Sequence, residues 1–95
     1  MTQFDWINPV AEWLAELYEK KFGGKDKGRY RISAGLVRKA AGRNRLYEDD
    51  VRMLSRVLLE KGFVLIDMDS FFVVMSVNSF VNYRRANDHC FEDIN

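Results

Sequence analysis

Two apolar runs that meet at a short polar break limit the folds open to this chain more than any other feature. Residues 63–69 read FVLIDMD and residues 71–77 read FFVVMSV. Both runs are rich in β-branched and aromatic side chains, which favour strands, and Asp69-Ser70 between them favours a tight turn. The sequence therefore predicts a β-hairpin in this part of the chain.

A first helix is predicted near the start of the chain. Asn8 is expected to cap it, with Pro9 as its first helical residue, and Gly23-Gly24 to end it. Its apolar residues recur at helical spacing, and together with Trp6 they are expected in the core: Val10, Trp13, Leu14, Leu17, Tyr18 and Phe22. The GGKDKG stretch that follows, residues 23–28, predicts a flexible loop.

A short strand, RYRIS over residues 29–33, is predicted before two further helices. Ser33 is expected to cap the second helix and Gly42 to end it, and the third helix runs from the RNR turn at 43–45 to Gly62. The second helix is expected to give the core Leu36, Val37, Ala40 and Ala41. The third is expected to give a stripe of Tyr47, Val51, Leu54 and Leu58, widened by Met53, Val57 and Leu59.

The 95 residues predict one α+β domain, with its core at about 5–86. After the hairpin, Asn78 or Ser79 is expected to cap a short helix over FVNYRRA, residues 80–86, although a continued strand also fits the pattern. The acidic tail at 87–95 is expected to be flexible.

The composition of 47% hydrophobic and 31% charged residues is typical of a globular domain. The longest apolar region contains Asp67 and Asp69, so it does not predict a membrane span. A single cysteine, Cys90, excludes an internal disulfide, and the N-terminus lacks the pattern of a signal peptide. We therefore expect an intracellular protein.

Charge is strongly segregated along the chain. Residues 20–45 carry a net charge of +9, and the remaining residues carry −8. Asp26 is the only acidic residue within this basic stretch. Such asymmetry indicates a surface for an anionic partner, although a solvated lysine-rich loop is the plainer interpretation of part of it.

The sequence does not predict an enzyme, a metal site or a cofactor. His89-Cys90 supplies two adjacent ligands, whereas a zinc site needs three or four. Asp67 and Asp69 share a strand face but lack a third ligand, so a turn role is expected for them. The FGGKDKG stretch lacks the spacing of a phosphate-binding glycine loop.

The order of helix, strand, helix, turn, helix and hairpin resembles the winged-helix domain family. The resemblance rests on residues 29–77 and is most specific in VRMLSRVLLEKGFVLID, residues 51–67, which is similar to the family's third helix and first wing strand. It implies a three-helix bundle with a short strand and a C-terminal hairpin wing. It also implies duplex DNA as the partner, regulation of transcription as the function, and a homodimer, for which Phe4 and Trp6, or Phe80, Val81 and Tyr83, are candidate contacts.

In that family the third helix lies in the major groove and the wing touches the DNA backbone or minor groove. The resemblance together with the basic stretch makes Asn44 and Arg52 the candidates for base contacts. The candidates for phosphate contacts are Lys25, Lys27, Arg29, Arg31, Arg38, Lys39, Arg43, Arg45 and Arg56.

Two acidic features suggest an alternative function. The third helix opens with three carboxylates and the hairpin tip carries two more, and carboxylates repel phosphates. The alternative is a protein-interaction winged helix, either an adaptor or a phage- or virus-encoded inhibitor of a nucleic-acid enzyme. Its working surface would be an acidic patch of Glu48, Asp49, Asp50, Asp67 and Asp69. The plainer interpretation is that the acids in the first turn stabilise the helix end.

A third possibility is the binding of single-stranded nucleic acid or RNA, which needs exposed aromatic rings for stacking. Tyr30 and Tyr47 are the candidates for this role beside the basic stretch.

Overall fold

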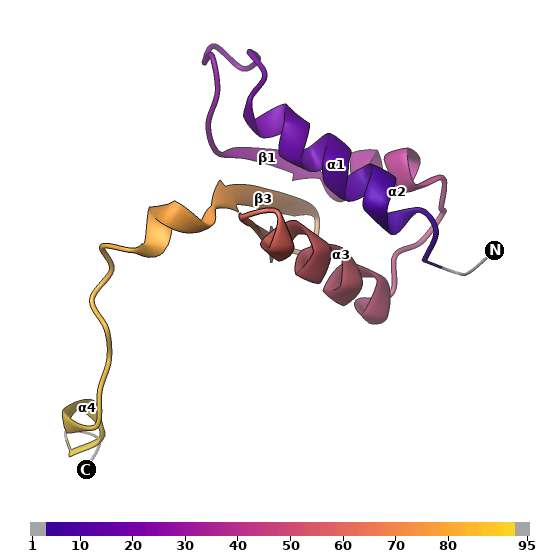
Figure 1. Cartoon of the computed structure of the whole chain (residues 1–95). Helices are drawn as coiled ribbons and strands as arrows, with labels where there is room; N and C mark the ends of the chain where they lie inside the picture. Colours follow the sequence, from indigo (N-terminus) through magenta and orange to yellow (C-terminus); the bar gives the residue numbers. More distant parts are fainter. Residues whose placement is uncertain (1–3, 93–95) are drawn as a thin grey trace.

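The computed structural model describes residues 4–92, which form an α+β protein with a three-stranded antiparallel sheet (Figure 1). The prediction of the α+β class is confirmed. In chain order the elements are α1 (Ile7–Tyr18), β1 (Tyr30–Ser33), α2 (Ala34–Ala41), α3 (Glu48–Glu60), β2 (Phe63–Asp67), β3 (Phe71–Ser76), the 3-10 helix η1 (Val77–Phe80) and α4 (His89–Glu92).

The predicted hairpin is present as β2 and β3. Leu65 lies opposite Val74, and β1 pairs with the other edge of β3, so that the strand order is β1-β3-β2. At the tip, Asp69 adopts a positive φ of 71° and its N–H donates to the Asp67 carboxylate at 2.8 Å. This Asp67 contact is the turn role that the sequence predicts.

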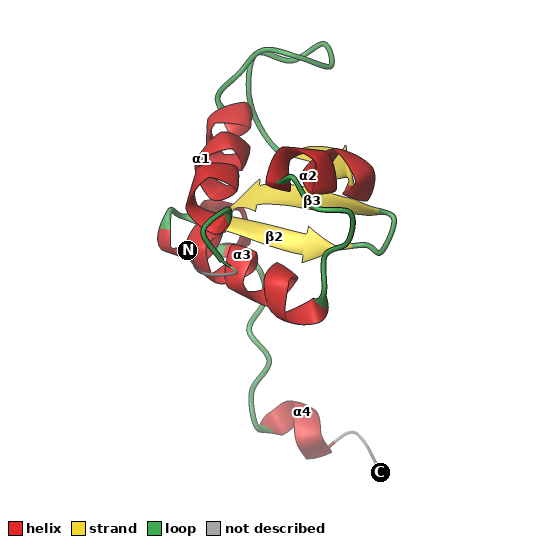
Figure 2. Cartoon of the chain, turned by 90° about the vertical axis from the view of Figure 1, so that its right-hand side faces the viewer, coloured by secondary structure: helices red, strands yellow, loops and turns green. Residues whose placement is uncertain are grey.

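The core lies between the sheet and the helices α1, α2 and α3, which surround it in Figure 2. Burial alternates along β1, where Tyr30 and Ile32 are buried and their neighbours are exposed. The buried apolar residues are Ile7, Val10, Ala11, Leu14, Tyr30, Ile32, Ala34, Val37, Leu54, Leu58, Leu65, Phe72 and Val74. Every element from α1 to β3 therefore contributes to one core.

The predicted start of α1 is wrong by two residues, and the predicted end, just before Gly23-Gly24, is wrong by four. The helix begins at Ile7 with Trp6 as its N-cap, because the Ile7 N–H already donates to the Phe4 carbonyl at 3.0 Å. Pro9 is the third helical residue, where its missing N–H costs nothing. The helix ends at Tyr18, whose carbonyl accepts from the Gly28 N–H at 2.9 Å.

Several residues expected in the core are exposed. Leu36 on α2 is 46% exposed, and Leu59 on α3 is 57% exposed. Tyr47 is the N-cap of α3 rather than part of its apolar stripe. On α3 the helix rotation explains the correction, because Leu54 and Leu58 define the buried face. Leu59 is the next residue after Leu58 and is therefore turned by about 100° away from that face. The exposed members of the expected core sets are Phe22, Leu36, Ala40, Tyr47, Met53 and Leu59.

The C-terminal helix predicted over 80–86 is also wrong. The 3-10 helix η1 ends at Phe80, and the Ser76 hydroxyl, not Asn78 or Ser79, caps it by accepting from the Asn78 N–H. Residues 81–92, here called the arm, are all exposed and extend away from the body (Figure 1). The Cα radius of gyration is 15.9 Å, against about 13 Å for a compact domain of 100 residues. The arm contains α4, in the first part of the tail that was expected to be flexible.

Among the described residues, no helix is long and apolar enough to cross a membrane.

A short hydrogen bond lies within the core, where the Tyr30 hydroxyl donates to the Leu14 carbonyl at 2.6 Å. Burial raises the pKa of Tyr30 well above its usual range, so this donor keeps its proton. The contact ties β1 to α1.

Candidate nucleic-acid interface

Four basic residues lie on α2 and in the turn that follows it, and two of them, Arg38 and Arg45, line one groove. Ser33 caps α2 by accepting from the Leu36 N–H at 3.1 Å, and Gly42 ends it with a positive φ of 68°. Both helix boundaries confirm the prediction. We call the four residues the turn cluster: Arg38, Lys39, Arg43 and Arg45.

The turn is held to the body by its own contacts. The Arg43 N–H donates to the Arg38 carbonyl at 3.0 Å, and the Arg43 guanidinium lies 5.6 Å from the centre of the Trp6 ring. Such a cation–π contact contributes roughly 0.5–1 kcal/mol at an exposed site. Trp6 therefore supports the position of Arg43, a role that the sequence analysis missed.

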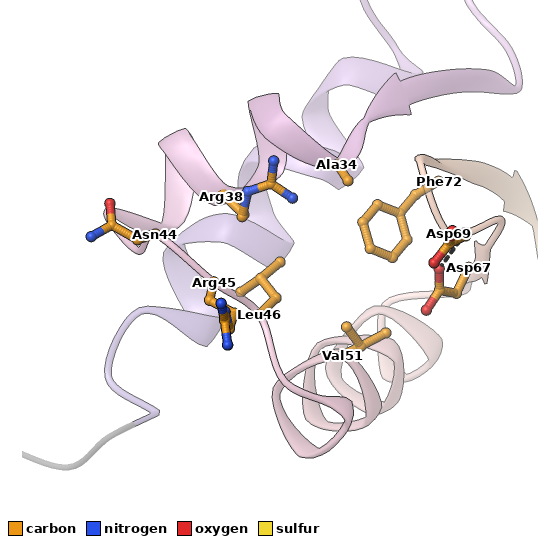
Figure 3. Close-up of a pocket in the computed structure, with 9 residues that line it drawn as sticks. All are labelled: Ala34, Arg38, Asn44, Arg45, Leu46, Val51, Asp67, Asp69 and Phe72. Carbon is orange, nitrogen blue, oxygen red and sulfur yellow. Dashed lines mark hydrogen bonds between the residues drawn. The ribbon is translucent and has the colours of Figure 1, made fainter.

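A groove of about 350 Å³ runs from the turn cluster to the hairpin tip (Figure 3). Figure 3 shows arginines and Asn44 along the α2 side, and Asp67 and Asp69 on the opposite side. Between them lie Ala34, Leu46, Val51 and Phe72. The groove thus has a cationic wall, an anionic wall and apolar residues between the two.

The acidic start of α3 has two separate roles. Asp50 is only 5% exposed, and its carboxylate accepts from the Tyr47 N–H at 2.8 Å, which caps the helix. Glu48 and Asp49 are exposed and both face Arg52, at 3.4 and 3.8 Å. These exposed ion pairs are worth little in stability, but they place negative charge beside Arg52, one of the two candidates for base contacts.

The acidic patch of the alternative function is therefore incomplete. Asp50 is buried in the cap, and Asp67 is engaged at the hairpin tip. The hairpin carboxylates also share their groove with Arg38 and Arg45. The five carboxylates therefore do not form one exposed acidic surface, and the expectation of such a surface is wrong.

The basic stretch does not form one surface either. Lys25, Lys27, Arg29 and Arg31 belong to the loop after α1 and to β1, whereas the turn cluster belongs to α2 and the turn after it. Figures 1 and 2 both show the loop at one end of the body, remote from the turn between α2 and α3. The structure thus divides the predicted phosphate contacts into two groups.

The remaining candidates, Asn44, Arg52 and Arg56, lie in the turn and on α3. Asn44 is exposed and points out from the turn in Figure 3, and Arg52 and Arg56 are exposed on successive turns of α3. Arg31 on β1 lies 5.6 Å from the centre of the Phe71 ring. The exposed face of α3 therefore offers two arginines beside three exposed carboxylates, Glu48, Asp49 and Glu60.

Within residues 4–92, no group of three His, Cys, Asp or Glu side chains is placed to hold a metal ion. Cys90 is exposed in α4, and the His89 ring pairs with Glu92 at 3.7 Å.

Comparison with known proteins finds no relative of this chain. No protein-family model matches the chain, and no curated protein or solved structure is significantly similar to it. Any function must therefore be argued from the site itself.

Proposed function

We propose that this chain is a winged-helix protein that binds duplex DNA through the turn cluster and acts as a transcriptional regulator. The element order and the antiparallel hairpin at the end of the body support the winged-helix arrangement. In this arrangement α2 and α3 are the helix-turn-helix and the β2–β3 hairpin is the wing.

The single observation that carries the proposal is the charge of the turn cluster. No acidic residue occurs between residues 27 and 47 of the sequence. Among the ion pairs of the described residues, none involves Arg38, Lys39 or Arg45. Three of the four side chains of the turn cluster are thus outside the ion pairs of the described residues. Basic side chains placed in this way on a helix end and turn are suited to phosphates, which position a protein on a duplex.

Base contacts would come from Asn44 and from Arg52. Asparagine binds adenine and arginine binds guanine in the major groove by paired hydrogen bonds. Arg52 first has to leave Glu48 and Asp49, so the phosphate contacts supply most of the affinity. Arg56 lies one turn further along α3 and would reach a phosphate.

A salt titration of duplex binding tests the proposal. If the four residues of the turn cluster each neutralise one phosphate, affinity falls by about a hundredfold between 50 and 200 mM salt. Replacing Arg43 and Arg45 together by Glu is expected to abolish the binding of a labelled duplex measured by fluorescence anisotropy. The reason is that two attractive contacts become repulsive.

The matched control carries the same change of charge at the other end of the body, with Lys25 and Lys27 replaced by Glu. This variant is expected to keep most of the duplex affinity. Equal losses in the two variants would show that duplex DNA responds only to net charge, and the turn cluster would not be the contact.

We also propose that the protein acts as a homodimer through the arm. Val81 and Tyr83 are 72% and 61% exposed, and Phe91 is 77% exposed. A four-residue helix such as α4 is not stable alone in water, so we expect a second copy to cover it. Sedimentation equilibrium should give a dimer that becomes a monomer when Val81 and Tyr83 are replaced by Asp. A wild-type monomer at high concentration would contradict this.

A further inference from the structure

The loop between α1 and β1 is folded by hydrogen bonds of its own. Phe22 and Lys25 exchange two backbone hydrogen bonds, at 3.0 and 3.1 Å, around Gly23-Gly24. Both glycines have positive φ, as a two-residue hairpin turn requires. The Gly28 N–H then returns to the Tyr18 carbonyl at 2.9 Å. The stretch that the sequence predicts to be a flexible loop thus has a defined shape.

This loop forms a pocket of about 420 Å³ with an unbalanced charge. No carboxylate lines it, and the nearby Asp26 pairs instead with Lys21, at 4.0 Å and on the exposed surface. We call it the loop pocket. Its lining consists of Gly23, Gly28 and Tyr30 together with Lys20, Phe22, Lys25, Lys27, Arg29 and Arg31. The pocket is therefore suited to an anion with more than one negative charge.

An aromatic ring stands among these cations. Phe22 was expected in the core, but α1 ends before it, and the side chain is 42% exposed. The ring meets Tyr30 edge-on, with the centroids 5.5 Å apart. Tyr30 is itself fixed by its hydrogen bond to Leu14. Phe22 thus rests on a rigid support and still offers ring surface to a ligand.

We infer that the loop pocket binds single-stranded nucleic acid, with a base stacked on Phe22 and the adjacent phosphates held by Lys25, Lys27 and Arg29. Sites for single strands combine a positive groove with exposed aromatic rings, and both features are present in this pocket. A base within a duplex is covered by its neighbours on both faces, so it cannot stack on a protein ring without being flipped out. This second site is independent of duplex binding by the turn cluster.

Binding of a short, labelled oligothymidylate, measured by fluorescence anisotropy at low salt, tests the inference. Replacing Phe22 by Ala is expected to weaken this binding by about fivefold to a hundredfold, the usual range for a lost stacking partner. Phe22→Leu keeps an apolar contact with Tyr30 but has no aromatic face, so it should lose binding as well. Phe22→Trp should retain it.

Duplex binding provides the second readout. The Phe22 variants should bind the duplex as the wild type does, and Arg43→Glu with Arg45→Glu should keep oligothymidylate binding. The inference is overturned if Phe22→Leu, folded by circular dichroism, binds oligothymidylate as tightly as the wild type. It is also overturned if Phe22→Leu weakens duplex and single-strand binding equally, because the two ligands would then share one site.

Discussion

The turn cluster and the loop pocket come from one basic stretch of sequence but differ in what supports their charges. The turn cluster consists mainly of arginines on a capped helix and its C-terminal turn, and Arg43 rests on Trp6. Across the groove it faces the carboxylates of the hairpin tip. The loop pocket has three lysines and two arginines around a glycine turn, with Phe22 among them and no carboxylate in its lining.

Under the two proposals, the surroundings of a charge decide which anion it binds. Arginine presents its donors in a rigid fork, which suits phosphates held at fixed spacing on a duplex. Lysine is a flexible point charge, which follows a strand of variable shape, and an aromatic ring adds stacking to it. Net charge alone does not separate these two cases.

Among substitutions next to the turn cluster or the loop pocket, loss of the Asp50 cap is expected to change the free energy of unfolding most. Asp50→Ala removes the acceptor of the Tyr47 N–H, so the free energy of unfolding should fall by about 1–2 kcal/mol. For a domain of this size each 1 kcal/mol lowers Tm by about 4–8 °C, which calorimetry can measure. Because the cap fixes residues next to the turn cluster, duplex affinity should fall while oligothymidylate affinity stays the same.

Asp49→Ala is the matched control for the cap. Asp49 lies in the same helical turn, but it is exposed and faces Arg52 rather than a backbone N–H. The free energy of unfolding of this variant should lie within about 0.5 kcal/mol of the wild-type value, as for most surface substitutions. If the Asp50→Ala variant remained folded and bound both duplex and oligothymidylate more weakly, by the same factor, the two basic regions would not be independent.

Much of the fold was predictable because local signals agree with the packing. The Ser33 cap, the Gly42 stop and the hairpin around Asp69 are each set by residues next to them in the sequence. The start of α1 could not be predicted in this way, because Trp6 and Phe4 lack the polar side chain of a usual cap. The end of α1 is set by the hydrogen bond from Gly28 to Tyr18, which joins residues ten apart in the sequence.

The candidate site was predictable in its residue types but not in its layout. Ten basic residues in one stretch give no sign that β1 and α2 carry them to two ends of the body. Phe22 was missed because its spacing continues the apolar face of α1, although Gly23-Gly24 directly after it was a signal that the chain turns there. The Trp6 contact with Arg43 depends on the tertiary fold and had no sequence signal.

The smallest predicted effect concerns the acids beside the turn cluster. Replacing Glu48 by Gln and Asp49 by Asn removes both partners of Arg52. Exposed ion pairs are worth at most about 1 kcal/mol, so duplex affinity should rise by only about two- to fivefold at low salt. Oligothymidylate binding should not change, because the loop pocket lies at the other end of the body. Glu16→Gln with Glu19→Gln, which removes the same charge from α1, is the matched control and should raise duplex affinity less.

A third substitution decides what the gain means. If the released Arg52 contacts a base, adding Arg52→Gln to the Glu48→Gln and Asp49→Asn variant should remove the gain and reduce discrimination between duplex sequences, as the loss of a base contact does. If the gain persists without Arg52, the carboxylates act only by repelling phosphates. The third helix would then lie near the duplex without reading it, and the turn cluster would account for binding by itself.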